Sequence, residues 1–146
     1  MKQWVYLGQR VEDPNKDKAM ILRVENDKGN DITSSIVDNP DFQFILVAYE
    51  LYITNKEAFH KILPFYKKAI ADGYSFICLT NSLNDEIGKF KLDNGIAFDF
   101  YNADDVVLKT MVRSNPGLIL IRNGIVLAKW HYHDFPSYQD VMKKFR

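Results

Sequence analysis

Cysteine and histidine, the side chains best suited to redox and metal chemistry, are few in this sequence. Cys78 is the single cysteine, so the chain cannot form an internal disulfide. It lies in the apolar run SFICLT, where burial disfavours the thiolate and a cysteine behaves as a small hydrophobic residue. We therefore interpret Cys78 as a structural residue.

The histidines raise the question of a metal site. His131 and His133 form an H-x-H pair at the end of a predicted strand, a spacing that places both on one face. Asp134 follows them, and His60 lies near the start of a predicted long helix. A zinc site needs three or four converging ligands. The favoured interpretation is an exposed polar strand end, and metal binding through His131 and His133 is an alternative.

Other common chemistries lack their sequence signatures. No Walker loop, G-x-G-x-x-G, H-E-x-x-H or G-x-S-x-G motif occurs. Nineteen basic residues balance nineteen acidic ones, which gives no electrostatic argument for binding nucleic acid. No apolar run approaches the roughly 20 residues that cross a bilayer, and the first residues lack a signal-peptide core. We expect a soluble domain without cofactor or nucleic-acid partner, which can belong to a longer, membrane-attached protein.

The elements that must position these residues alternate between strands and helices. The predicted long helix begins after Thr54 or Asn55 as its cap and ends at Gly73. The Asn123-Gly124 pair is a strong hairpin signal. In order, we predict strands at 4–11, 19–26 and 42–51, a helix at 56–73, a strand at 74–80, a helix from Ser82 or Asn84 to about Leu92, a strand at 95–103, a helix at 104–112, a hairpin at 117–130 and a helix at 137–146.

This order indicates an α/β fold with helices on both faces of a central sheet. The closing hairpin adds antiparallel pairs, so the sheet should be mixed. We expect one domain over residues 1–146, with 1–41 as an extension carrying extra N-terminal strands and 42–146 as the core. The long helix should bury one face, formed by apolar residues at helical spacing: Phe59, Ile62, Leu63, Tyr66 and Ile70.

The segment VRSNPGLILIRNG, residues 112–124, carries a resemblance to a known family. Thioredoxins have a similar run before their last hairpin, in which a cis-proline precedes an apolar strand and a basic turn with glycine. Pro116 falls on that proline, so the resemblance implies a thioredoxin-like fold over about 42–146 and a cis Asn115–Pro116 bond. The additional helix and strand after 74–80 resemble the insertion of the TlpA-like and peroxiredoxin branches.

The resemblance also shows what is missing. Thioredoxins carry C-x-x-C at the start of the helix after the central strand, where the helix N-terminus stabilises one thiolate and the second thiol resolves the mixed disulfide. Family helices often have a proline five residues beyond the second cysteine. Taking Pro64 as that proline places Lys56 and Phe59 on the two cysteine positions. Moving the register by two gives Thr54 and Glu57, so neither register supplies a thiol.

Two consequences follow for this degenerate site. In the Pro64 register we expect Phe59 to point inward against the Pro116 loop, with Lys56 at the rim. Glu50 falls where thioredoxins have a buried acid that assists proton transfer. Because the thiol it would serve is absent, we favour a strand-end Glu50 that faces solvent or pairs with Lys56.

A second likeness concerns residues 115–138, NPGLILIRNGIVLAKWHYHDFPSY. This stretch is similar to the C-terminal soluble domain of Bacteroidetes membrane proteins of the DoxX type, which resemble thioredoxins without the cysteine pair. The likeness implies a domain tethered to, or accessory to, a membrane protein, with that membrane domain as one expected partner.

The resemblance further implies a groove for extended peptides between the Pro116 loop and the entrance of the long helix. We expect Ser114, Asn115, Pro116 and Tyr52 to form it. Our hypothesis is a non-catalytic interaction or sensory domain that binds a protein or peptide. The alternatives are a thiol-redox protein that uses Cys78 or a partner thiol, and a metal-binding domain.

Overall fold

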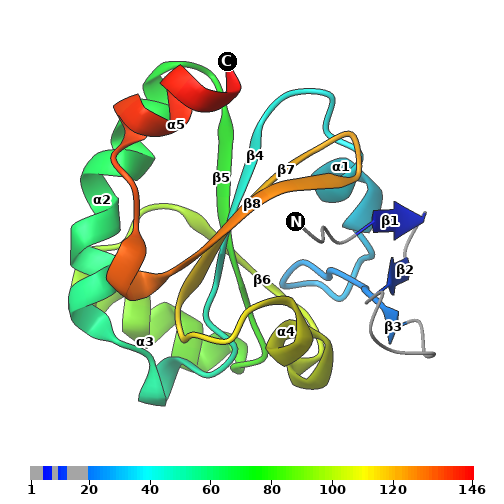
Figure 1. Cartoon of the computed structure of the whole chain (residues 1–146). Helices are drawn as coiled ribbons and strands as arrows, with labels where there is room; N and C mark the ends of the chain where they lie inside the picture. Colours follow the sequence, from blue (N-terminus) through cyan, green and yellow to red (C-terminus); the bar gives the residue numbers. More distant parts are fainter. Residues whose placement is uncertain (1–4, 8–9, 13–19) are drawn as a thin grey trace.

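The strands of the computed structural model form one mixed sheet, in the order β3-β2-β1-β8-β7-β4-β5-β6 (Figure 1). The structure describes residues 5–7, 10–12 and 20–146, with side chains from Leu22 onward. The strands are β1 (Val5–Leu7), β2 (Arg10–Glu12), β3 (Met20–Ile21), β4 (Gln43–Val47), β5 (Ser75–Thr80), β6 (Asp99–Asn102), β7 (Gly117–Arg122) and β8 (Ile125–His131). The α-helices are α1 (Thr33–Val37), α2 (Lys56–Ala71), α3 (Asn84–Asn94), α4 (Asp105–Met111) and α5 (Tyr138–Phe145), and two 3-10 turns are η1 (Leu51–Ile53) and η2 (Tyr132–Asp134).

The directions of the central strands confirm the predicted mixed sheet. β4 runs parallel to β5, and β5 parallel to β6, while β7 is antiparallel to both β4 and β8. Because β4, β5 and β6 are parallel, their carboxyl ends share one edge of the sheet, and the segments η1, α3 and α4 begin there (Figure 1). We call this edge the carboxyl edge.

Helices cover both faces of the sheet. α2, α3 and α5 lie on one face, and α1 and α4 lie on the other (Figure 1). β4 contributes to both cores, because its successive side chains point to opposite faces: Phe44 and Leu46 to the first, Ile45 and Val47 to the second. All five β4 residues are buried, as predicted for a central strand.

α2 begins and ends at the predicted signals, although its buried face differs from the prediction. The Asn55 side chain accepts a hydrogen bond from Ala58 N, and Gly73 takes a positive φ of 85° just past the helix. The prediction of Ile70 as a core residue is wrong, since it is 46% exposed, whereas Phe65 is buried. The buried stripe follows residues 58, 62, 65 and 69, so Ile70 lies about 100° round the helix from it.

The N-terminal part departs most from the predicted elements. The run 4–11 contains two strands, β1 and β2, which pair antiparallel with Leu7 opposite Arg10. Its central glycine, a turn-forming residue, is the sequence signal against one continuous strand. The run 19–26 contributes β3 and then single bridges from Glu25 to Asp31 and Asn102. The five-residue α1 was not predicted, because it is too short to show a helical period.

The other elements match their predicted positions to within a few residues. Asn123 and Gly124 both have positive φ, 51° and 78°, as the two central residues of a primed hairpin turn require. In the described part of the chain, no helix is long and apolar enough to cross a membrane.

Candidate functional site

The entrance of α2 is joined to the Pro116 loop by two hydrogen bonds at the carboxyl edge. Asn55 N donates to the Asn115 carbonyl at 3.0 Å, and Asn115 Nδ2 donates to the Glu50 carbonyl at 2.9 Å. The Asn115–Pro116 peptide bond is cis, as predicted. These contacts show that the fold brings together the two segments that the sequence predicts as the walls of a groove.

A further hydrogen bond lies within the Pro116 loop itself. Ser114 Oγ donates to the Pro116 carbonyl at 2.8 Å. Gly117 follows, and a Cβ there would lie 2.9 Å from Val112 Cβ, closer than side chains approach. Gly117 is therefore a residue on which the loop depends and which the sequence analysis did not single out.

Phe59 is fully buried, which confirms the predicted inward orientation. The neighbours of the ring differ from the prediction. Phe59 contacts Phe90 edge-on at 4.8 Å between ring centroids, and stacks on Phe98 and Phe100 at 6.3 and 6.2 Å. The ring packs against α3 and the chain at the start of β6, whereas the Pro116 loop was expected. The reason is that this additional helix and strand pack beside the first turns of α2.

The other positions of the two registers carry no thiol and differ in exposure. Lys56, the first residue of α2, is exposed, as is Glu57. Thr54 is buried, and its Oγ1 has no hydrogen-bond partner among the described residues, which is also true of the buried Asn115 Oδ1. The entrance of α2 therefore presents a lysine and a glutamate to solvent.

Glu50 lies beyond the end of β4 and is half-buried, which fits the strand-end interpretation better than a buried acid. Its partner is Tyr52, whereas the prediction was that Glu50 faces solvent or pairs with Lys56. A hydrogen bond to Glu50 and the negative charge of that carboxylate raise the pKa of Tyr52. The Tyr52 side chain is nevertheless 73% exposed and stands open at the carboxyl edge.

Cys78 lies in the middle of β5, away from the entrance of α2 in the sheet. Its side chain is fully buried, and desolvation raises the pKa of the thiol well above its ordinary value. A buried thiol that keeps its proton is a poor nucleophile, because the thiolate is the reactive form.

A cavity of about 270 Å³ lies beside the first turn of α2. It brings Lys61 together with Tyr132 and His133, a grouping that sequence spacing did not indicate. β8 ends at His131, and His133 lies beyond the strand, in η2. The centroids of the two imidazole rings are nevertheless 4.7 Å apart. His131 Nδ1 accepts from His133 N. Among the residues that the structure describes, no three His, Cys, Asp or Glu side chains are placed to hold a metal.

Comparison with solved structures places this architecture among known proteins. A thiol-disulfide oxidoreductase from Bacteroides fragilis aligns with a TM-score of 0.64 and 12% identity, over 85% of this chain and 96% of that one. The thioredoxin domain of a thiol-disulfide oxidoreductase from Bacteroides vulgatus aligns with a TM-score of 0.63 and 12% identity, over 86% and 94%. The chain has the thioredoxin-like fold.

The likeness extends to peroxidases of the same architecture. A thiol peroxidase from Chromobacterium violaceum aligns with a TM-score of 0.56 and 12% identity, over 97% of this chain and 94% of that one. No protein-family model matches the sequence, and no curated protein matches it either. At 12% identity the neighbours establish the thioredoxin-like fold alone, so function must be argued from the site.

Proposed function

We propose that this chain is a non-catalytic thioredoxin-like domain that binds a protein or peptide partner. The observation that carries the proposal is the entrance of α2, which presents no thiol: Lys56 is exposed and Phe59 is fully buried, and the Pro64 register assigns these two residues to the positions of the missing cysteine pair. Disulfide exchange needs a thiolate there and a second thiol to resolve the mixed disulfide. Cys78 supplies neither, since it is buried in β5 with a raised pKa.

The exposure of the four predicted groove residues supports a surface centred on Tyr52. Ser114 and Pro116 are buried and Asn115 is half-buried, whereas Tyr52 is open to solvent. The Asn115 carbonyl and amide group already bond to Asn55 and Glu50, so they hold the loop rigid. A partner would therefore meet a pre-formed edge with Tyr52 and its exposed neighbour Ile53 as the apolar contacts.

Two activity assays test the absence of catalysis. Insulin reduction by dithiothreitol and hydrogen peroxide consumption should proceed at the rate of buffer alone when the purified protein is added. The matched control is Cys78→Ser, which should give the same rates. Turnover above buffer that disappears in Cys78→Ser would overturn the proposal and assign the chain a thiol-redox function.

A role beside a membrane domain is part of the same proposal. The similarity of residues 115–138 to the soluble domain of DoxX-type proteins supports it. Reading the complete gene provides the test: membrane-spanning segments in the same open reading frame, or in an adjacent gene whose product co-purifies with this chain, are expected. A gene and a neighbourhood without either would contradict this part of the proposal.

A further inference from the structure

Three exposed apolar side chains stand at the carboxyl edge on three different elements. Tyr52 of η1 is 73% exposed, Leu83 before α3 is 71% exposed, and Val106 of α4 is 54% exposed. We call these residues the edge patch. Large apolar side chains that remain exposed side by side are typical of a surface that another molecule covers.

Electrostatic effects and hydrogen bonds connect the elements that carry the three residues. η1, which carries Tyr52, packs against α3, and the charges of Glu86 in α3 and Lys109 in α4 both act on the Tyr52 hydroxyl. The Glu86 carboxylate accepts from Leu83 N. Lys109 is one helical turn from Val106 and therefore on the same side of α4.

A polar cavity of about 260 Å³ adjoins the edge patch. Two chain connections link them. Asn81 lines the cavity two residues before Leu83, and the intervening Ser82 carbonyl accepts from Asn102 Nδ2, which also lines the cavity. Asp104, another lining residue, accepts from Val106 N at 2.8 Å. An extended segment that covers the edge patch can therefore place a neighbouring side chain in the cavity.

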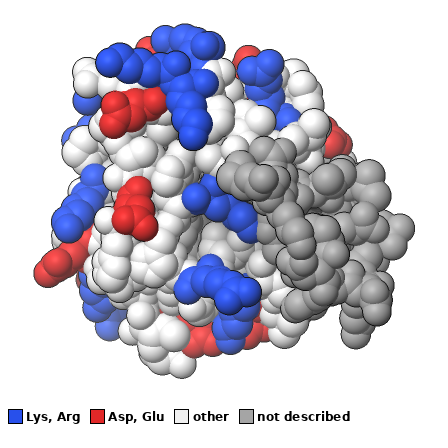
Figure 2. Space-filling view, in the orientation of Figure 1, with Lys and Arg blue, Asp and Glu red and all other residues white. Residues whose placement is uncertain are grey.

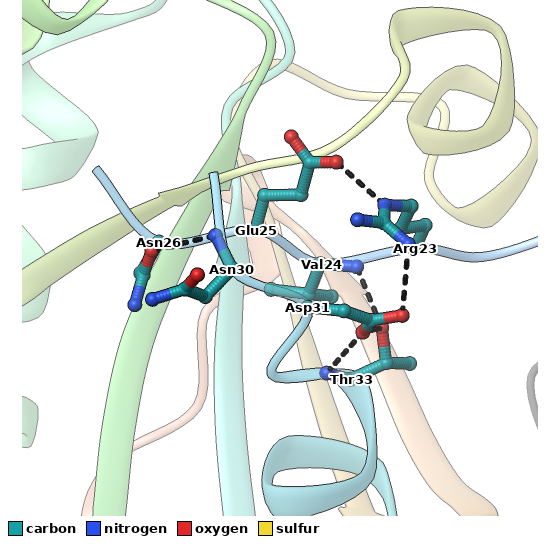
Figure 3. A network of polar contacts seen from close by, with 7 residues as sticks. All are labelled: Arg23, Val24, Glu25, Asn26, Asn30, Asp31 and Thr33. Carbon is teal, nitrogen blue, oxygen red and sulfur yellow. Dashed lines mark hydrogen bonds and ion pairs between the residues drawn. The ribbon is translucent and has the colours of Figure 1, made fainter. Parts of the chain in front are cut away.

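The cavity and its surroundings are rich in acceptors of hydrogen bonds. Glu25 and Asp104 contribute carboxylates, and Asn81 and Asn102 contribute amides. Figure 3 shows the Glu25 carboxylate joined to Arg23, which also pairs with Asp31 at 3.1 Å. The cation that lines the cavity is thus already paired with two carboxylates, which leaves the cavity better suited to a second cation than to an anion.

Acidic side chains also surround the edge patch itself. The carboxylates of Glu50 and Glu86 both raise the pKa of Tyr52, and Asp105 pairs with Lys109 at 3.3 Å. Figure 2 shows Lys and Arg side chains gathered over α5 at the upper end of the molecule, with acidic side chains among them, and side chains of both signs at the lower end.

We propose that the edge patch and the adjoining cavity together bind a protein segment in which an arginine or lysine lies next to an aromatic or aliphatic residue. The apolar side chain covers Tyr52, Leu83 and Val106, and the cation enters the cavity beside Glu25 and Asp104. Guanidinium and ammonium groups are donors only, which matches the carboxylate and amide oxygens there. This inference rests on the proposed function, for which it names the chemistry of the partner.

The test titrates ¹⁵N-labelled protein with three synthetic peptides and follows the backbone amide resonances. The first is acetyl-Gly-Arg-Phe-Arg-Gly-amide, the second has Glu in place of both Arg residues, and the third has Ala in place of Phe. The first peptide should shift the resonances of Asn81, Leu83, Asn102 and Val106. The second should shift none of them, and the third should bind more weakly than the first.

Isosteric variants test the two carboxylates. Glu25→Gln and Asp104→Asn should each raise the Kd of the first peptide about two- to fivefold, the effect of a partly exposed ion pair. Asparagine caps helices as well as aspartate does, so Asp104→Asn should preserve α4. Asp93→Asn, the same charge change at an exposed site late in α3, is the matched control and should leave the Kd unchanged.

Three outcomes would overturn the inference: equal binding of the Arg and Glu peptides, shifts that cluster at Asn55, Lys61 and His133 around the other cavity, or no binding of any peptide at millimolar concentration. The catalytic assays remain separate. Cys78-dependent turnover together with binding of the first peptide would contradict the proposed non-catalytic function and support the binding surface. Absence of turnover together with absence of peptide binding would leave the non-catalytic function standing and contradict the binding surface.

Discussion

Phe59 is the residue through which the proposed degenerate site at the entrance of α2 can be tested most directly. Its ring is fully buried and lies in contact with three other phenylalanines. Phe59→Ala removes these contacts and leaves a cavity, so it should lower the free energy of unfolding by about 3–5 kcal/mol. Urea denaturation followed by circular dichroism provides the measurement.

The control for Phe59→Ala is His60→Ala at the next position of α2. His60 is exposed, so this change should alter the free energy of unfolding by less than about 0.5 kcal/mol. Equal stability of the two variants would mean that Phe59 does not fill the site.

Cys78 gives a second prediction, on thiol accessibility. The native protein should react with Ellman's reagent at a small fraction of the rate of the urea-unfolded chain, because the side chain is fully buried and its pKa is raised. The pH dependence has a definite sign. As pH rises above the ordinary thiol pKa, the unfolded chain loses the proton that the folded chain keeps, so stability falls.

The matched control for the alkaline loss of stability is Cys78→Ala. Without the thiol, the fall in unfolding free energy above the ordinary thiol pKa should be smaller than in the wild-type chain. Native Cys78 that reacts as fast as the unfolded chain would contradict both the burial and the structural role of this residue.

For single residues, the sequence predicts that the Phe59 side chain points inward, but it does not predict which side chains the ring contacts. The inward orientation follows from helical spacing within α2, which is a local property. Phe90, Phe98 and Phe100 are more than 30 positions away, and only the folded chain brings them to α2. The contact between Tyr52 and Glu50 could not be predicted either, because it depends on the path of the chain where β4 ends.

Among the elements, α5 is tied to the end of α2 by a hydrogen bond that can be removed cleanly. Tyr138 Oη donates to Asp72 Oδ2 at 2.6 Å, and Arg146 also contacts Asp72. The Tyr138 bond is the main cause that lowers the pKa of Asp72. Tyr138→Phe should therefore raise the pKa of Asp72 toward its ordinary value, as measured by carbon-detected NMR titration.

The same bond makes stability depend on acid pH. A lowered folded-state pKa gives Asp72 a stabilising contribution above the ordinary carboxyl pKa, and this contribution is lost as pH falls through the lowered value. The acid loss of stability should be smaller in Tyr138→Phe. Tyr66→Phe, which removes a hydroxyl from α2 without touching Asp72, is the control; if both variants titrate alike, α5 is not held through this bond.

Elements with strong local signals could be predicted, and those fixed by pairing could not. The closing hairpin follows from Asn123-Gly124, and α2 follows from its cap and apolar spacing. α1 has five residues and no period to detect. The glycine in the run 4–11 signals a break, but the pairing of β1 with β8 and of β2 with β3 is not encoded by any local pattern.

For the molecule as a whole, the α/β order of elements predicts the sheet and its two covered faces. The cavities could not be predicted from the sequence. The cavity beside the edge patch combines Arg23 and Glu25 with residues from the ends of β5 and β6. These segments are separated by more than 50 positions and meet where Glu25 bridges to Asn102. Such a site has no spacing signature in the sequence, so its chemistry could be inferred only once the fold was known.

The sheet also divides the interior into two cores, and this division can be measured by double-mutant cycles. Phe59 and Phe90 belong to the core under α2, α3 and α5, and their rings are in contact, whereas Ile119 belongs to the core under α1 and α4. Phe59→Leu and Phe90→Leu should show a coupling energy of about 0.5–3 kcal/mol, as contacting residues do. Phe59→Leu and Ile119→Val should add within about 0.5 kcal/mol, because the sheet separates them and they share no contact. Urea denaturation of the single and double variants gives both numbers. Strong coupling across the sheet would show that the two cores respond as one unit, and that a partner bound at the carboxyl edge can influence both faces through β4.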